Sequence, residues 1–280
     1  MQTETPTERA LPDRMDADGT PLLTAKAYSE ASVFRPQNLL REGRRQRGRP
    51  EIVVPRTCLL DPDGDIVRHL VARGLAVEHP GWACYHTTLW VFRLEGTEIG
   101  VVGCAVGSAF AVLVAEQLAA SGCELVISVS SAGTITAVDD PPHFILVERA
   151  LRDEGTSLHY LPPSTWANAP ARLLELISQG GWLASPAMVA GSTWTTDAPY
   201  RETATAIERA AELGILAVEM EAAALYAYAA ASDRDVICVA HVTNSMATDG
   251  DDFEKGEDDG VHDALAVVGA LIATLSAHPA

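Results

Sequence analysis

The chain has 280 residues, of which 48% are hydrophobic, 21% charged and 6% aromatic. This composition is typical of a soluble globular protein and argues against a disordered, fibrous or membrane-spanning chain. The net charge of −18 at pH 7 argues against a nucleic-acid partner and a membrane partner, because a negative surface repels phosphate groups.

The first fifty residues differ from the rest of the chain. Residues 1–50 hold nine Lys or Arg and seven Asp or Glu, and they lack sustained periodicity. We expect an N-terminal arm here, partly extended and with one short helix, followed by one large domain over residues 51–280. Five arginines form a basic patch at residues 41–49. We interpret the patch as solvated or docked on an acidic neighbour, in preference to a phosphate or nucleic-acid site.

Strand and helix patterns alternate from residue 51 onward. The predicted strands lie at 51–55, 99–106, 124–133, 143–151, 187–194, 215–218 and 235–243, with a hairpin over 82–96 that turns near 94–97. The predicted helices span 65–73, 108–121, 170–180, 202–213, 219–231 and 261–277. This alternation predicts a parallel or mixed sheet covered by helices, an α/β fold.

Signals for metals, disulfides and targeting are weak. The five cysteines are widely spaced and contain no CxxC pair, so we expect free thiols in a cytoplasmic protein. Residues 61–72 begin like a calcium loop, but Ile66 stands where glycine is needed and Ala72 where glutamate is needed. The acidic run from Asp249 to Asp259 is typical of a solvated loop. The sequence therefore predicts no metal site, and the apolar stretch 264–275 is too short to span a membrane.

A strand meets a helix at the segment AVEMEAAALYAYAA. Glu219, Met220 and Glu221 lie at this junction, where the helix dipole favours carboxylates. A carboxylate can accept hydrogen bonds from both hydroxyls of a ribose while a methionine packs on the sugar. Spacing alone favours the simpler interpretation, an acid that caps an ordinary helix.

Four segments carry a family resemblance. They are, in chain order, GCELVISVSSAGTI, STWTTDAPYRE, AVEMEAAALYAYAA and VTNSMATDGDDFEKGE. Together they resemble the nucleoside phosphorylase family, which includes uridine phosphorylase, hexameric purine nucleoside phosphorylase and methylthioadenosine nucleosidase, over roughly residues 51–277. The resemblance implies a three-layer α/β/α sandwich with a distorted mixed β-sheet, in a homo-oligomer, dimer or hexamer. It also implies a nucleoside substrate and no cofactor, with inorganic phosphate as co-substrate.

The activity implied by the resemblance is phosphorolysis of an N-glycosidic bond to a free base and a sugar 1-phosphate. Glu221 would bind the ribose diol, with Met220 on the sugar and Glu219 in support. Negative charge near the sugar stabilises the oxocarbenium ion that develops as the bond breaks. Asn244 would lie near the base, which it can hydrogen-bond but not protonate. Asp197 and Tyr200 match the segment that lines the base pocket, and Arg201 is close enough in sequence to reach it.

The chain departs from the family at its phosphate-binding positions. The family's Gly-Asp-Pro-x-Arg loop follows the first strand, which we place at 51–55, so residues 55–61 would form this loop without its glycine. The family's second arginine position falls in residues 128–133, and a third falls near Tyr85 or His86. The candidate replacements are Arg56, Arg201 and the arginines of the basic patch.

These departures leave two alternatives to phosphorolysis. In the first, the protein is a hydrolase in which Ser130, Ser131 and the amide of Gly133 hold a water molecule in place of phosphate. In the second, it is a catalytically inactive relative that binds nucleosides.

Overall fold

The computed structural model describes residues 20, 22–24, 26–138, 142–180, 188–244 and 255–276. Residues 1–19, 21 and 25 of the predicted arm, Ser245 and the acidic residues 249–254 lie outside these ranges. The helices are α1 (Pro36–Arg47), α2 (Asp65–Ala72), α3 (Ser108–Ala120), α4 (Ser157–Tyr160), α5 (Ala171–Gln179), α6 (Ala204–Glu212), α7 (Ala222–Ser232) and α8 (Val261–Ser276), with two 3₁₀ turns, η1 (Pro199–Arg201) and η2 (Glu257–Gly260). The strands are β1 (Thr57–Asp61), β2 (Val77–Glu78), β3 (Leu89–Leu94), β4 (Thr97–Gly103), β5 (Leu125–Thr134), β6 (His143–Asp153), β7 (Trp166–Asn168), β8 (Met188–Thr196), β9 (Ile215–Glu219) and β10 (Asp235–Asn244).

The strands form one mixed sheet in the order β10-β6-β8-β9-β5-β1-β4-β3-β2. β10 also pairs with β5, so β5, β10, β6, β8 and β9 close into a ring at one end of the sheet. Register shifts in β6 and β10 let these long strands bend. The prediction of an α/β fold with a distorted mixed sheet is confirmed, and the closure explains the distortion.

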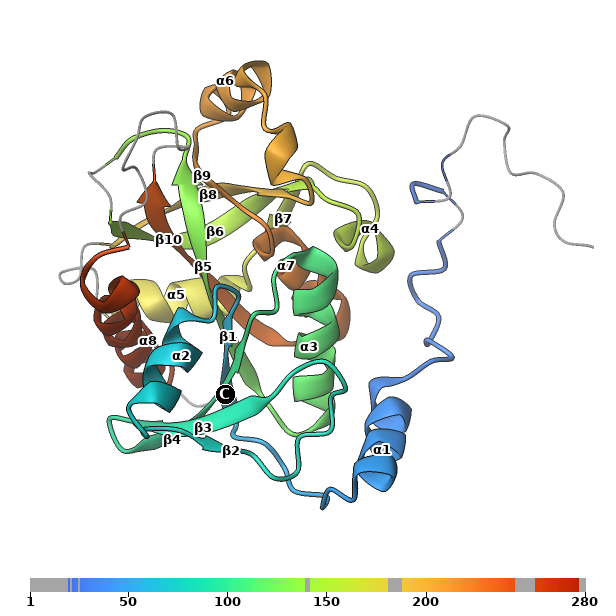
Figure 1. Cartoon of the computed structure of the whole chain (residues 1–280). Coiled ribbons are helices and arrows are strands. Elements are labelled where there is room, and N and C mark those ends of the chain that lie inside the picture. The colour runs from blue at the N-terminus through green and yellow to red at the C-terminus, as the bar shows by residue number, and fades with distance from the viewer. Residues whose placement is uncertain are drawn as a thin grey trace, which may run out of the picture.

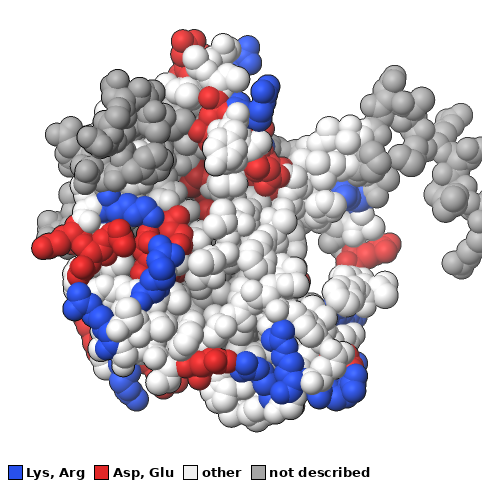
Figure 2. All heavy atoms as spheres, viewed as in Figure 1, with Lys and Arg blue, Asp and Glu red and all other residues white. Residues whose placement is uncertain are grey.

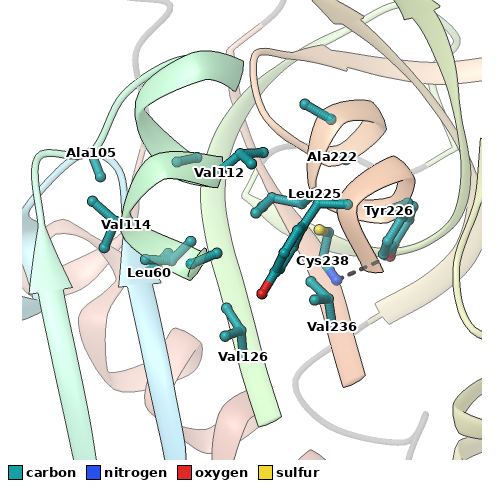
Figure 3. Packing of buried hydrophobic residues seen from close by; sticks show 14 of the residues in the cluster. Leu60, Ala105, Val112, Val114, Val126, Ala222, Leu225, Tyr226, Val236 and Cys238 are labelled. Carbon is teal, nitrogen blue, oxygen red and sulfur yellow. Dashed lines mark hydrogen bonds between the residues drawn. The ribbon is translucent and has the colours of Figure 1, made fainter. Parts of the chain in front are cut away.

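Helices cover both faces of the sheet (Figure 1). Successive residues of a strand point to opposite faces, and in β1 Leu60 packs with α3 and α7 whereas Leu59 packs with α2, α5 and α8. On the first face small side chains let α7 approach the sheet closely (Figure 3). There the buried Tyr226 hydroxyl donates to the Val147 carbonyl at 2.5 Å and accepts from the Cys238 amide at 3.0 Å.

The first strand lies later in the chain than the sequence predicted. Residues 51–55 form no strand, and Val53 is 75% exposed. Pro55 has no N–H to contribute to a sheet ladder, whereas β1 (Thr57–Asp61) is enclosed between the parallel strands β4 and β5. The predicted strand at 51–55 is therefore wrong, and the loop after the first strand begins at Pro62.

Helix α1 docks against the segment before β3 (Figure 1). Arg47 donates to the carbonyls of Cys84 at 2.7 Å and Tyr85 at 3.0 Å. Arg49 pairs with Glu78 at 2.7 Å. Gly43 allows the close approach, because a Cβ there would lie 2.6 Å from the Ala83 carbonyl oxygen. These arginines of the basic patch are engaged in holding α1 in place.

Among the described residues, Glu257–Ser276 is long and apolar enough to cross a membrane by length and composition. Half of its most apolar window is buried inside the protein, where α8 packs on the second face of the sheet. A core helix of a soluble protein has these properties.

Candidate functional site

The carboxyl ends of β1, β5 and β10 meet at one edge of the sheet, because these strands are parallel neighbours. Ligands of α/β proteins commonly bind at this edge. A cavity of about 350 Å³ opens there. Its lining includes Ser131, Gly133, Tyr200, Glu202, Met220 and Asn244. The fold thus brings most of the predicted site residues around one cavity.

Glu219 ends β9 and caps the helix that follows. One of its carboxylate oxygens accepts from the hydroxyls of Thr195 at 2.5 Å and Thr193 at 3.2 Å. The other accepts from the amides of Glu221 and Ala222, both at 2.7 Å. Burial raises the pKa of Glu219, although these hydrogen bonds oppose the rise. The predicted helix over 219–231 therefore begins at Ala222, and Glu219 fixes the turn that places Met220 at the cavity.

Glu221 lies behind the cavity wall, and it is 1% exposed. Its carboxylate accepts from the Gly107 amide at 2.7 Å and from the Ser130 hydroxyl at 2.7 Å. Burial, with a smaller contribution from the negative charge of Glu219, raises the pKa of Glu221 to about 7. Glu221 and Ser130 thus form a buried pair that joins the start of α3 to β5.

The loop after β1 brings an unexpected carboxylate into the site. Asp63 accepts from both donors of Ser131, from the amide at 3.1 Å and from the hydroxyl at 2.9 Å. Sequence analysis missed Asp63 because it placed the first strand too early. The signal was the Asp61-Pro62 pair, which matches Asp-Pro of the family's Gly-Asp-Pro-x-Arg pattern with Leu60 and Gly64 at its glycine and arginine positions. The glycine and the arginine are still absent, but residues 55–61 are not the loop.

The candidate replacement arginines lie elsewhere. Arg56 pairs with Glu124 at 2.5 Å, at the opposite end of β1 from the cavity. Arg47 and Arg49 hold α1 in place. Arg201 lies in the exposed turn η1 and does not line the cavity. A lysine lies beside the Asp63 loop instead, because the Lys255 ammonium is 3.6 Å from an Asp63 carboxylate oxygen.

Tyr200, Glu202 and Asn244 form another part of the cavity lining. Asp197 does not line this cavity, because its carboxylate accepts from the Gly155 amide at 2.8 Å. Glu202, which directly follows Arg201, was missed because no pattern distinguishes it from an ordinary surface acid. Burial raises the pKa of Glu202. This part of the cavity therefore offers an amide and a carboxyl group to a ligand.

No cluster that could hold a metal ion occurs among the residues that the structure describes. The calcium-like pattern at 61–72 has a different role, because Asp61 accepts from the amides of Gly64 at 3.1 Å and Val67 at 2.9 Å. Asp61 thereby caps the start of α2.

Comparison with known proteins shows two similarities. The model of a family described as the phosphorylase superfamily matches residues 57–273. Two crystal structures of uridine phosphorylase from Vibrio fischeri ES114 are similar in fold. The first, complexed with 6-hydroxy-1-naphthoic acid, has a TM-score of 0.66 and 23% identity over 81% of this chain and 93% of that one. The second has a TM-score of 0.65 with the same identity and coverage. Comparison with curated protein sequences gives no match.

Proposed function

Because the chain belongs to the phosphorylase superfamily, we propose that it is an enzyme that cleaves the N-glycosidic bond of a nucleoside. The cavity at the strand ends supports this proposal, since Met220, Ser131, Gly133, Asn244 and Glu202 all line it. In the proposed complex the sugar packs on Met220 and the base extends toward Asn244. Glu221 supports the ribose-binding part of the cavity from behind the lining residues. To accept from the ribose diol itself, its carboxylate must give up the hydrogen bond from Gly107 or from Ser130.

We further propose that water, rather than phosphate, attacks the sugar. The single observation that carries this step is the Asp63 carboxylate on both donors of Ser131. A phosphate dianion at this place would meet Asp63 and Glu221, and like charges out of bulk water repel strongly. A partly exposed carboxylate beside the Ser131 wall of the cavity is instead suited to act as a general base.

In the proposed step, water displaces the base at the anomeric carbon of the sugar. Asp63 takes a proton from water as the water oxygen bonds to the anomeric carbon. The bond from that carbon to the base nitrogen breaks, and the base leaves with the electron pair and then takes up a proton. The products are free base and free sugar. The nearby carboxylates stabilise the positive charge that develops on the sugar during bond cleavage.

The base end favours a base that presents a ring N–H. An ionised Glu202 accepts hydrogen bonds and cannot donate them, while the Asn244 amide can do both. Hypoxanthine, guanine and uracil carry a ring N–H on their Watson–Crick edge, and adenine does not. We therefore expect inosine, guanosine or uridine to be better substrates than adenosine.

The test is base release from these four nucleosides with and without inorganic phosphate, with the sugar product identified by mass. Hydrolysis predicts free ribose at a rate that phosphate does not change, and one ¹⁸O atom per ribose in labelled water. Phosphate-dependent formation of ribose 1-phosphate would overturn the proposed water step and support phosphorolysis. Binding of a nucleoside by calorimetry without base release from any of the four would support an inactive relative.

A further inference from the structure

The segment that leads into η2 places one lysine beside the Asp63 loop. We propose that Lys255 is a positioning residue for the reaction, whose ammonium group holds the Asp63 carboxylate in place beside Ser131. This inference rests on the proposed function, in which Asp63 is the base that activates water. Lys255 contacts Asp63 and is not required to touch the substrate.

The contacts of Lys255 fix its ammonium group between two carboxylates. Its Nζ lies 2.6 Å from one oxygen of Asp65 and 3.6 Å from one oxygen of Asp63. The other oxygen of Asp65 pairs with Arg68. The Asp65 side chain is 10% exposed, so this anchor is well enclosed. Asp65 therefore holds the ammonium beside Asp63, and the Asp63 oxygen nearest to the ammonium also accepts from the Ser131 amide.

The backbone around Lys255 is held close to β10. Gly260 has a φ of +71°, and a Cβ there would lie 2.3 Å from both the His241 ring and the Lys255 carbonyl oxygen. His241 is the partner of Ser131 in the register of β10 and β5. The segment that carries Lys255 therefore packs against His241, and His241 is the neighbour of Ser131 in the sheet.

The charges around Asp63 show why a cation is needed. Asp61 at the end of β1 and Glu221 before α7 both interact with it electrostatically, and Asp65 at the start of α2 shares the Lys255 ammonium with it. Arg68 of α2 donates to the Asp63 carbonyl, not to its carboxylate. Among the described residues, Lys255 is the cation that pairs with this carboxylate. Negative neighbours favour the protonated form of an acid, and a close cation favours the ionised form.

His241, the remaining titratable group that faces Asp63, does not supply that cation at neutral pH. Its ring stacks on Phe144 with 4.5 Å between the centroids. Burial, which outweighs the opposing charge of Asp63, lowers the pKa of His241 to about 4. Burial also lowers the pKa of Lys255, but the hydrogen bond that it donates to Asp65 and the charges of Asp63 and Asp65 outweigh this and raise it. Lys255 thus stays charged over the range in which Asp63 must act.

The test compares K255M and K255R in the full chain, measuring base release from inosine between pH 5 and 9. For K255M we expect kcat to fall by roughly 10- to 100-fold, the size of effect that misplacing a catalytic group produces. We expect little change in KM, and the acidic limb of the kcat/KM profile should move to higher pH. K255R should recover much of the rate and the original profile. R73M is the matched control, because Arg73 pairs with Asp258 of the neighbouring η2 turn and not with Asp63.

The outcomes separate this inference from the function on which it rests. Wild-type kcat and pH profile in a folded K255M protein would overturn the role of Lys255. A phosphate-dependent reaction in which K255M raises the KM for phosphate would also overturn it, because Lys255 would then bind the anion itself. Full activity of D63N would instead overturn the proposed function, whatever K255M does. Thermal unfolding of each variant checks that the comparison is made between folded proteins.

Discussion

The carboxylates on the two sides of the cavity differ in burial and in hydrogen bonding. On the side where we propose that ribose binds, Glu219 and Glu221 are enclosed, with every carboxylate oxygen accepting from an amide or a hydroxyl. On the side where we propose that water attacks, the Asp63 side chain is 30% exposed and the Lys255 ammonium lies 3.6 Å away. Figure 2 shows the acidic and basic side chains that gather on this face of the molecule. The difference is consistent with the proposed function, in which the enclosed pair shapes the site and the more exposed carboxylate exchanges protons.

The largest expected effect comes from the enclosed side. Glu221→Ala should reduce base release by roughly 10³-fold, since it removes a negative group from beside the developing positive charge. It also leaves the Ser130 hydroxyl and the Gly107 amide without this acceptor, so Glu221→Gln is the companion variant that keeps one oxygen. Steady-state kinetics together with a thermal unfolding curve give the measurement. Full activity of Glu221→Gln would show that the carboxylate is not needed.

The next largest effect is expected for Asp63, the more exposed carboxylate. Asp63→Asn keeps an acceptor for Ser131 but cannot take a proton, so kcat should fall by about 10²-fold, the lower end of the usual contribution of a general base. KM should change little, because Met220 and the base end are untouched. Asp258→Asn provides the control, since Asp258 pairs with Arg73 on the surface. Equal losses in both variants would point to the overall charge of this face instead of Asp63.

A smaller effect is expected at the base end. Glu202→Gln should reduce the preference for inosine over adenosine by about 10- to 100-fold, the discrimination that one hydrogen bond to a charged group supplies. The amide can donate to the ring nitrogen of adenine, whereas the ionised carboxylate only accepts. The ratio of kcat/KM for the two nucleosides is the measurement. An unchanged ratio would mean that the base does not contact Glu202.

The smallest effect concerns stability. Burial raises the pKa of Asp61 to about 7 from 3.8, so between these values the folded chain holds a proton that the unfolded chain has lost. The free energy of unfolding should therefore fall as pH rises from about 4 to 7 and level off above. This shift corresponds to a contribution of at most about 4 kcal/mol. Denaturant unfolding of wild type and Asp61→Asn at pH 5 and pH 8 measures it, and a variant with the wild-type pH dependence would contradict it.

Local pattern predicted most elements of the fold to within a few residues. The error at residues 51–55 had a physical cause, because the apolar run Ile52–Val54 fits a strand but Pro55 interrupts its ladder and Thr57–Asp61 competes for the buried position. Because the first strand was placed too early, Asp63 was not among the predicted site residues. The helix predicted over 219–231 begins three residues later, at Ala222. Glu219 still belongs to the preceding strand, and its carboxylate accepts hydrogen bonds from the amides of Glu221 and Ala222.

The sequence by itself determined the α/β alternation, the family and the Glu219-Met220-Glu221 segment, because each depends on residues that are close along the chain. Only the tertiary structure decided that Asp63 reaches Ser131, that Lys255 reaches Asp63 and that Glu202 lies at the cavity while Asp197 does not. These contacts join residues far apart in the sequence. Such pairs form when folding brings the carboxyl ends of parallel strands together. The spacing of residues along the sequence does not show which strand ends become neighbours.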